Sequence, residues 1–307
     1  MSVDHPILIA GPTAGGKSGL ALRLAERLGG VVINADSMQV YRELRVLTAR
    51  PSLEDEARAP HALYGFVAGA EGYSAGRYAA DAARALADAR RQGLRPIFVG
   101  GTGLYFKTLI EGLSPIPAID PGIREHWRNE AAEKGALSLH GILSERDPAM
   151  AERLAPGDTQ RVVRALEVLE ATGTSLLEWQ RLPREPVLDL AQAVAIVAAP
   201  ERSELHRHIA VRFAAMMQQG ALEEAAQLGG LALDPSLPIM GALGLRPLLR
   251  HLAGEVTREE ALAAAQTETR QYAKRQLTWA RGNMLAWKWL DTKEIESTAI
   301  DSIMFID

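Results

Sequence analysis

The sequence of 307 residues contains no cysteine. A disulfide framework, a thiolate zinc site and a cysteine nucleophile are therefore excluded, and the composition is typical of a protein from a reducing cytosol. No apolar run approaches the length of a membrane span, and the first residues lack the basic start and apolar centre of a secretory signal. We therefore expect a cytoplasmic protein without a membrane-spanning segment.

An excess of positive charge is also absent, since 34 Lys and Arg stand against 38 Asp and Glu, for a formal net charge of −4. This balance argues against indiscriminate nucleic-acid binding but allows a local basic site. Residues 270–290 are a candidate, because they contain Arg270, Lys274, Arg275, Arg281 and Lys288 and no acidic side chain. Two interpretations are open: contact with a phosphate backbone, or a basic surface helix without a partner.

One short motif carries most of the chemical information. An apolar run leads into a segment that fits the GxxxxGK[ST] phosphate-binding pattern, and a helix-forming segment follows it. The glycines let backbone N–H groups surround phosphate oxygens, the lysine can reach a terminal phosphate, and the serine hydroxyl can hold Mg²⁺. The default ligand of this pattern is a nucleotide such as ATP. The phosphate-binding residues are Gly11, Pro12, Thr13, Ala14, Gly15, Gly16, Lys17 and Ser18.

The N-terminal third alternates short apolar runs with helical stretches. Strands are predicted at residues 7–10, 31–35 and 96–99, and a helix at about 75–91. Strands separated by helices favour a parallel sheet with helices on both faces. The predicted fold class is therefore α/β, with a phosphate-binding loop at the carboxyl edge of a parallel sheet.

The middle of the chain has a different character. It is helical without a clear strand, it has proline-rich segments at both ends, and a further strand follows at residues 194–198. We therefore expect an all-helical insertion domain of residues 116–193. The catalytic core would consist of residues 1–115 and 194–307.

The residues that follow two predicted strands help to distinguish a phosphate-binding protein from one that hydrolyses ATP. A nucleotide-hydrolysing protein of this class needs a second apolar strand that ends in Asp to support Mg²⁺. The strand at residues 96–99 ends in Gly100 and Gly101 instead, so hydrolysis is only weakly indicated. Asp36 follows the strand at residues 31–35, where a carboxylate can act as a general base or metal ligand. Its alternative role is a helix N-cap.

Arginine and aromatic side chains supply further candidates. Arg161 and Arg164 lie opposite an apolar helix face and point the same way, so they either clamp a polyanion or remain solvated. Arg212 falls at the edge of another apolar stripe, where it either snorkels or reaches a buried anion. Tyr272 and Trp279 share one helix face, a pattern that favours core packing over a base-stacking platform.

These motifs together resemble the bacterial tRNA dimethylallyltransferases, also called tRNA isopentenyltransferases. The matching blocks run in family order over about residues 7–290, and their combination is far more specific than the phosphate-binding loop alone. They are GPTAGGKS at 11–18, NADSMQVYR at 34–42, TARP at 48–51, GGTGLYFK at 100–107, QRVVRALEV at 160–168 and RQYAKRQLTW at 270–279.

The resemblance implies an enzyme that transfers a dimethylallyl group from dimethylallyl diphosphate to the exocyclic amine of an adenosine. That adenosine lies immediately 3′ of the anticodon in tRNA, and the products are isopentenyladenosine and diphosphate. The loop would hold the leaving diphosphate, with Mg²⁺ as cofactor on Ser18. Asp36 would accept the amine proton, Arg212 would neutralise charge, and Thr13 would hydrogen-bond the bridging oxygen.

The same resemblance implies contacts with the anticodon stem-loop, whose target base must leave its stack to enter a pocket. Residues around the flipped base, on the core and on the helical insertion would make them, in an enzyme expected to be monomeric. The implied tRNA-binding residues are Asp36, Ser37, Met38, Gln39, Thr102, Arg124, Gln160, Arg161, Val162, Val163 and Arg164.

Two blocks depart from the family pattern. The family commonly has an Asp or Glu in the block occupied here by residues 61–66, and its Ala-Ile-Gly-Tyr block reads Ala-Leu-Gly-Leu at residues 242–245. An aromatic contact near the RNA loop is therefore missing, which affects the fit of RNA but not the reaction. Three rivals stay open: an isopentenyltransferase of free adenine nucleotides, a small-molecule kinase, and a nucleotide-dependent RNA-binding switch.

Overall fold

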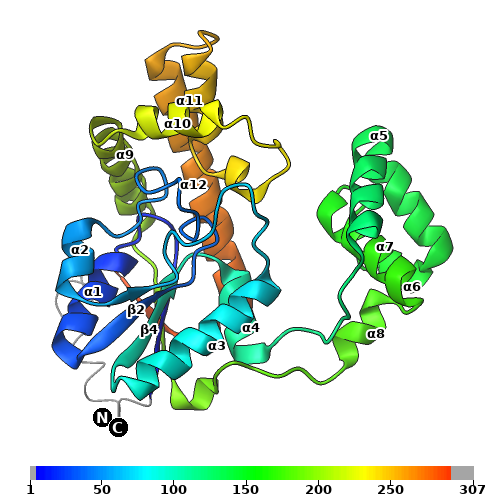
Figure 1. The fold of residues 1–307 in the computed structure, drawn as a ribbon, viewed down its shortest axis with the longest axis horizontal. Coiled ribbons are helices and arrows are strands. Elements are labelled where there is room, and N and C mark those ends of the chain that lie inside the picture. Colours follow the sequence, from blue (N-terminus) through cyan, green and yellow to red (C-terminus); the bar gives the residue numbers. More distant parts are fainter. Residues whose placement is uncertain (1–4, 292–307) are drawn as a thin grey trace. The chain divides into compact units, whose positions relative to one another are not determined.

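The structure is a computed structural model that describes residues 5–291 (Figure 1). It divides into two compact units. The first, which we call the sheet unit, combines Met1–Ile110 with Pro186–Asp307, and the second, the helical unit, is Glu111–Glu185. The chain re-enters the sheet unit directly after the helical unit, because Val187 and Leu188 both donate their backbone N–H groups to the carbonyl of Leu109.

The sheet unit is built on six parallel strands in the order β3-β2-β4-β1-β5-β6. Four of them agree with the predicted strands to within one residue at each end. The two edge strands are too short, at 2 and 3 residues, to show a periodicity in the sequence. The strands are β1 (Ile7–Ala10), β2 (Gly30–Asn34), β3 (His61–Ala62), β4 (Arg95–Gly100), β5 (Val194–Ala198) and β6 (Lys288–Leu290).

Helices cover both faces of this sheet, as the alternation of strands and helices predicted. They are α1 (Lys17–Leu28), α2 (Leu53–Arg58), α3 (Ala75–Arg91), α4 (Gly103–Glu111), α9 (Arg202–Gln218), α10 (Ala221–Gly230), α11 (Leu245–Leu252) and α12 (Arg258–Asn283). Figure 1 shows α9, α10 and α11 gathered around part of the long α12.

Two apolar cores lie on opposite faces of the sheet because side chains alternate along each strand. Ile7 and Ile9 of β1 pack into the core under α1, whereas Leu8 and Ala10 pack into the larger core shared with α3, α4 and α10 to α12. Strands buried on both faces read as continuous apolar runs, which is why their positions are visible in the sequence.

The strand order decides what meets at the carboxyl edge. Strands β2, β4 and β1 are consecutive neighbours, so the segments that follow them lie side by side. These segments are the phosphate-binding loop after β1, Asp36 after β2, and Gly101 and Thr102 after β4. Ligands of open α/β sheets bind at this edge.

The helical unit contains α5 (Pro121–Arg146), interrupted at Gly135, with α6 (Pro148–Ala151), α7 (Thr159–Thr172) and α8 (Leu176–Arg181). It has its own core, which includes Trp127, Leu139 and Leu143. The expectation of a single apolar face on α7 is wrong. This helix packs against both α5 and α8, so it also buries Ala165, Glu167 and Val168, whereas Leu169 stays half-buried.

No helix within residues 5–291 combines the length and the apolar character needed to cross a bilayer.

Candidate active site

The phosphate-binding loop forms a concave turn between β1 and α1. Ala14 and Gly16 have left-handed backbone angles (φ 61° and 80°), and such residues turn successive backbone N–H groups toward one side. Gly11 has a φ of 148°, and a Cβ there would overlap the carbonyl oxygen of Ala198 in β5. The loop is therefore shaped for an anion at the N-terminus of α1.

Lys17 is buried at the base of this loop, and its Nζ donates a hydrogen bond of 2.5 Å to the carbonyl oxygen of Pro12. Burial lowers the pKa of Lys17 to about 8, because the charged ammonium loses solvation. The negative charge of Asp36 partly opposes this shift, and the positive charge of Arg212 adds to it. A bound phosphate would favour the charged form of this lysine.

A cavity of about 410 Å³ lies over the loop. Its lining brings together predicted site residues from separate segments, namely residues 13–18 of the loop, Asp36, Gln39 and Arg212. Ser18 also borders the cavity and is solvent-exposed. The proposed phosphate, carboxylate and arginine groups therefore share one space, although Arg212 is far from Lys17 and Asp36 in the sequence. The cavity wall also contains Thr48 and Ala49 of the TARP block, together with Arg207 and His208, which the sequence analysis missed.

Asp36 is held by a buried asparagine that the sequence analysis did not recognise. Asn34 has no exposed surface; its Oδ1 accepts the Asp36 backbone N–H at 2.8 Å, and its Nδ2 donates to the Asp36 carbonyl at 2.9 Å. Carboxylate oxygen Oδ1 of Asp36 accepts the N–H of Met38 at 2.9 Å. The helix N-cap alternative is wrong, because residues 37–50 contain no helix. Asp36 ends a turn with its side chain at the cavity.

The turn after β2 is tied to the turn after β4. The backbone N–H of Ser37 donates to Thr102 Oγ1 at 2.9 Å, and Thr102 Oγ1 lies 3.3 Å from Ser37 Oγ. The Thr102 backbone N–H in turn donates to the carbonyl of Ala35 at 3.2 Å. Ser37, Met38 and Thr102 are half-buried, so each presents part of its surface to a ligand.

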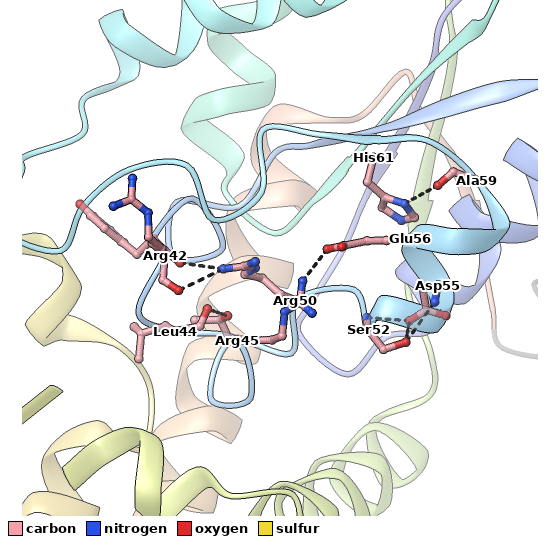
Figure 2. Close-up of polar contacts among 11 residues, drawn as sticks. Arg42, Leu44, Arg45, Arg50, Ser52, Asp55, Glu56, Ala59 and His61 are labelled. Atoms are coloured by element: carbon pink, nitrogen blue, oxygen red, sulfur yellow. Dashed lines mark hydrogen bonds and ion pairs between the residues drawn. The ribbon is translucent and has the colours of Figure 1, made fainter. Parts of the chain in front are cut away.

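The loop of residues 41–50 closes one side of the cavity and is held by side-chain bonds to its own carbonyls. Arg50 Nη1 donates to the carbonyls of Tyr41 and Arg42, at 3.1 and 3.3 Å, and Arg45 pairs with Glu56 at 2.7 Å. Figure 2 shows Arg50 next to Arg42, and Arg45 next to Glu56. Gln39 Nε2 donates to the carbonyls of Thr48 and Ala49, at 2.9 and 3.0 Å. This predicted RNA-binding residue therefore also supports the wall.

Arg212 lies on α9 and is half-buried at the cavity wall. Burial lowers its pKa, and the negative charge of Asp36 acts in the opposite direction. Of the two interpretations of Arg212, reaching an anion agrees with this position, since the phosphate-binding loop lines the same cavity.

The residues at the cavity fit a metal ion that comes with its substrate. Within residues 5–291 there is no group of three or more His, Asp or Glu side chains that could hold a metal by itself. Mg²⁺ is often bound by substrate phosphates and only one or two protein ligands. The Ser18 hydroxyl borders the cavity and suits a diphosphate-bound Mg²⁺.

The basic segment at residues 270–290 is not one helix. Helix α12 ends at Asn283, and Lys288 belongs to the edge strand β6. Tyr272 and Trp279 are half-buried and line a second cavity of about 270 Å³, which also includes Thr102. The two rings are therefore only partly packed in the core, and both border this second cavity. Arg275 lies 5.6 Å from the centre of the Tyr272 ring.

The predicted RNA-binding residues of the helical unit differ in exposure. Arg124, Gln160 and Arg161 are exposed, and Val162 and Val163 are buried in the core of the unit. An RNA contact here would therefore come from the exposed side chains.

The two predicted clamp arginines form ion pairs with different carboxylates. Arg161 pairs with Asp158 at 3.4 Å, whereas the half-buried Arg164 pairs with Glu167 at 3.1 Å. Each guanidinium therefore has its own carboxylate, which opposes the expectation that the two point the same way.

Gln276 of α12 is a further residue to which the sequence analysis assigned no role. It accepts the Thr13 backbone N–H through Oε1 and donates to the Gly101 carbonyl through Nε2, both at 2.8 Å. Its signal in the sequence is a polar residue in register with the buried positions Thr269, Ala273 and Ala280 of the same helix.

Comparison with known proteins agrees with this arrangement. The family model described as IPP transferase matches residues 39–283, and that described as isopentenyl transferase matches residues 5–64. The tRNA dimethylallyltransferase of Parvibaculum lavamentivorans is 53% identical over 305 residues, which cover 99% of this chain and 96% of the relative.

Solved structures lead to the same group. The tRNA isopentenylpyrophosphate transferase of Bacillus halodurans is 31% identical, with a TM-score of 0.69 over 98% of this chain and 96% of that one. A eukaryotic dimethylallyltransferase acting on tRNA is 26% identical, with a TM-score of 0.83 over 97% of this chain and 77% of that one. The chain thus belongs to the family of tRNA dimethylallyltransferases, as its sequence motifs predicted.

Proposed function

We propose that this protein transfers a dimethylallyl group from dimethylallyl diphosphate to the exocyclic amine of the adenosine immediately 3′ of the anticodon in tRNA. Family membership supports the class of reaction. The observation that carries the proposal is the shared cavity, in which a phosphate-binding loop with Lys17 and Arg212 faces the Asp36 carboxylate. This arrangement offers a site for a leaving diphosphate next to a base for an attacking amine.

The loop residues would hold the diphosphate through backbone N–H groups at the N-terminus of α1. Lys17 and Arg212 would neutralise the negative charge that grows on the leaving group as the allylic C–O bond breaks. The hydroxyl of Thr13 would donate to the oxygen that bridges the allyl group and the diphosphate. Bound Mg²⁺, held by Ser18 and diphosphate oxygens, would supply further positive charge to the leaving group.

Asp36 would act as the general base. The amine nitrogen forms a bond to C1 of the allyl group, the C1–O bond breaks, and its electron pair leaves with the diphosphate. The nitrogen then carries a surplus proton, which the Asp36 carboxylate accepts. Because Asn34 fixes the backbone of Asp36 on both sides, the carboxylate is pre-positioned for this transfer.

The adenine must leave its stack to reach Asp36. Ser37, Met38, Gln39 and Thr102 are half-buried near this carboxylate and would surround the flipped base. The exposed Arg124, Gln160 and Arg161, together with Arg164, would contact the anticodon loop from the helical unit. We further propose that the enzyme works as a monomer in the cytoplasm.

The proposal is tested with a synthetic anticodon stem-loop, dimethylallyl diphosphate and Mg²⁺, followed by mass spectrometry of the RNA. We expect one added C5H8 unit on the adenosine 3′ of the anticodon, and none when guanosine replaces that adenosine. RNA without the added unit would overturn the proposed transfer. Prenylation of adenosine monophosphate in preference to the stem-loop would identify the free-nucleotide enzyme instead.

The role of Asp36 is tested with Asp36→Ala. We expect prenylation to fall by at least about 100-fold, in the range of a lost general base, while the affinity for the stem-loop stays close to that of the unmodified protein. Turnover is measured from single-turnover RNA mass spectra and affinity by fluorescence anisotropy. If Asp36→Ala loses RNA affinity but still prenylates the RNA that it binds, Asp36 would have only a structural role in the turn.

A further inference from the structure

Gln276 occupies an unusual position between two functional loops. It lies on α12, yet its side-chain amide bonds to Thr13 in the phosphate-binding loop and to Gly101 in the turn after β4. These partners are 263 and 175 residues away in the sequence. Both bonds are 2.8 Å long, and both use backbone atoms of the partner. One amide group therefore joins the leaving-group side of the site to the acceptor side.

A carboxamide matches both partners at once in its ordinary, uncharged state. The Thr13 N–H needs an acceptor and the Gly101 carbonyl needs a donor, and a Gln side chain presents one of each. A carboxylate can accept from Thr13 but cannot donate to Gly101, and an apolar side chain can do neither. The chemical identity of residue 276 is thus determined by its two contacts.

The backbone around Gly101 is adapted to this contact. A Cβ at Gly101 would overlap Gln276 Nε2 and would lie 3.4 Å from Asp36 Oδ2, so the glycine lies between the amide and the carboxylate. A Cβ at Gly103 would overlap the ring of Trp279, one turn further along α12. The helix approaches the turn closely at both glycines, which leaves Gln276 directly behind the reacting groups.

We propose that Gln276 is a positioning residue, which fixes the distance between the diphosphate-holding loop and the acceptor side of the site. The inference rests on the proposed function. Thr13 lies in the loop that would hold the leaving group, and Gly101 lies beside the base and next to Thr102. When the two bonds are lost, each loop keeps its own ligand contacts, but the attacking amine and the allylic carbon are less well aligned. A misplacement of about 1 Å can cost about 100-fold in rate.

The first test is Gln276→Met, which keeps the length of the side chain and removes both bonds. We expect kcat to fall about 10- to 100-fold while KM for dimethylallyl diphosphate changes less than about 3-fold. The control is Gln227→Met on the exposed face of α10, which should leave both constants unchanged. Melting temperatures of all proteins are measured alongside. A kcat of Gln276→Met within about 2-fold of the unmodified enzyme would overturn the proposal. A decrease in kcat that is fully explained by the fraction of unfolded protein would overturn it as well.

The second test is Gln276→Glu. Its activity is measured over a range of pH and is divided at each pH by the activity of the unmodified enzyme. The neutral carboxylic acid can accept from Thr13 and donate to Gly101, whereas the carboxylate cannot donate. The activity ratio should therefore rise as pH falls through the pKa of the introduced carboxyl group, and Gln276→Met should show no such rise. A ratio that does not depend on pH would contradict the proposal. Failure of the unmodified enzyme to prenylate RNA would instead overturn the proposed function.

Discussion

At the scale of single residues, the fold changes the pKa of Lys17 in the phosphate-binding loop. The ammonium group is buried and donates to the Pro12 carbonyl, and burial brings its pKa down to about 8. A diphosphate next to it would favour the charged form, so the ligand and a proton should bind together. The same residue is recognisable in the sequence from its motif, but its altered pKa is not.

The pH dependence of diphosphate binding follows from this shift. Above about pH 8 the unliganded protein loses the Lys17 proton, so binding must take one up, and the affinity should fall by as much as about 10-fold per pH unit. The diphosphate group of dimethylallyl diphosphate does not change charge in this range, since the last ionisation of a phosphate ester lies near pH 6. Calorimetry with dimethylallyl diphosphate in two buffers of different ionisation enthalpy measures the affinity and the proton uptake.

Lys17→Met is the control for the pH dependence. It should bind diphosphate more weakly and without a decline between about pH 8 and pH 9.5. An affinity of the unmodified protein that stays constant over this interval, with no proton uptake, would contradict the role given to Lys17.

At the scale of elements, the loop of residues 44–50 is an example of irregular structure made rigid by one distant carboxylate. Glu224 of α10 accepts three consecutive backbone N–H groups, from Arg45, Val46 and Leu47, at 3.1, 2.6 and 3.2 Å. The bonds of Arg50 to two carbonyls hold the other end of the loop, as Figure 2 shows. The wall of the cavity thus depends on a residue about 180 positions away.

Glu224→Ala should release this loop. Hydrogen bonds to a charged group contribute about 1.5–3 kcal/mol each, but water replaces part of them here, so we expect a loss of about 1–3 kcal/mol in the free energy of unfolding. KM for dimethylallyl diphosphate should rise, because Thr48 and Ala49 border the cavity. Urea denaturation measures the stability, and amide hydrogen exchange measures the opening of residues 44–50.

Glu223→Ala is the matched control for Glu224→Ala, since the exposed Glu223 lies in the same helical turn and shares the interaction with the helix dipole. It should change stability by less than about 0.5 kcal/mol. Equal exchange of residues 44–50 in the two variants would show that Glu224 does not hold the loop.

At the scale of the whole molecule, the chain contains two units with separate apolar cores. The candidate active site lies entirely in the sheet unit, because all residues around the cavity belong to it. The helical unit carries exposed arginines but no part of this cavity. Under the proposed function, binding of diphosphate and binding of RNA should therefore be separable by substitutions in one unit.

Leu139→Ala tests this separation. Leu139 is fully buried in the core of the helical unit, and a cavity at such a site costs about 2–5 kcal/mol. We expect the helical unit to become sensitive to limited proteolysis and the affinity for the stem-loop to fall at least about 10-fold, with binding of inorganic diphosphate unchanged. Leu137→Ala, at a position that is 75% exposed, should leave both affinities intact. Parallel loss of diphosphate binding would show that the two functions are not separable.

Much of the candidate site was already predictable from local sequence patterns. The phosphate-binding loop is a continuous segment whose function depends on backbone shape, so its glycines, Lys17 and Ser18 identify it directly. Strands β1, β4 and β5 are buried on both faces and read as apolar runs. The sequence predicted Asp36 as a candidate functional carboxylate at a strand end, and the structure was needed to exclude the alternative of a helix N-cap.

The sequence by itself thus determined the α/β class, the anion-binding loop and membership of the family. Only the tertiary structure decided which strand ends are neighbours and that Asp36, Lys17 and Arg212 share one cavity. It alone showed the hydrogen bonds of Asn34, Gln276 and Glu224, as well as the edge strands β3 and β6. The physical reason is the separation of the contacting residues along the chain. A loop, or the apolar face of a helix, is encoded by residues that are close in sequence. The contacts named here join groups that only strand order and core packing bring together.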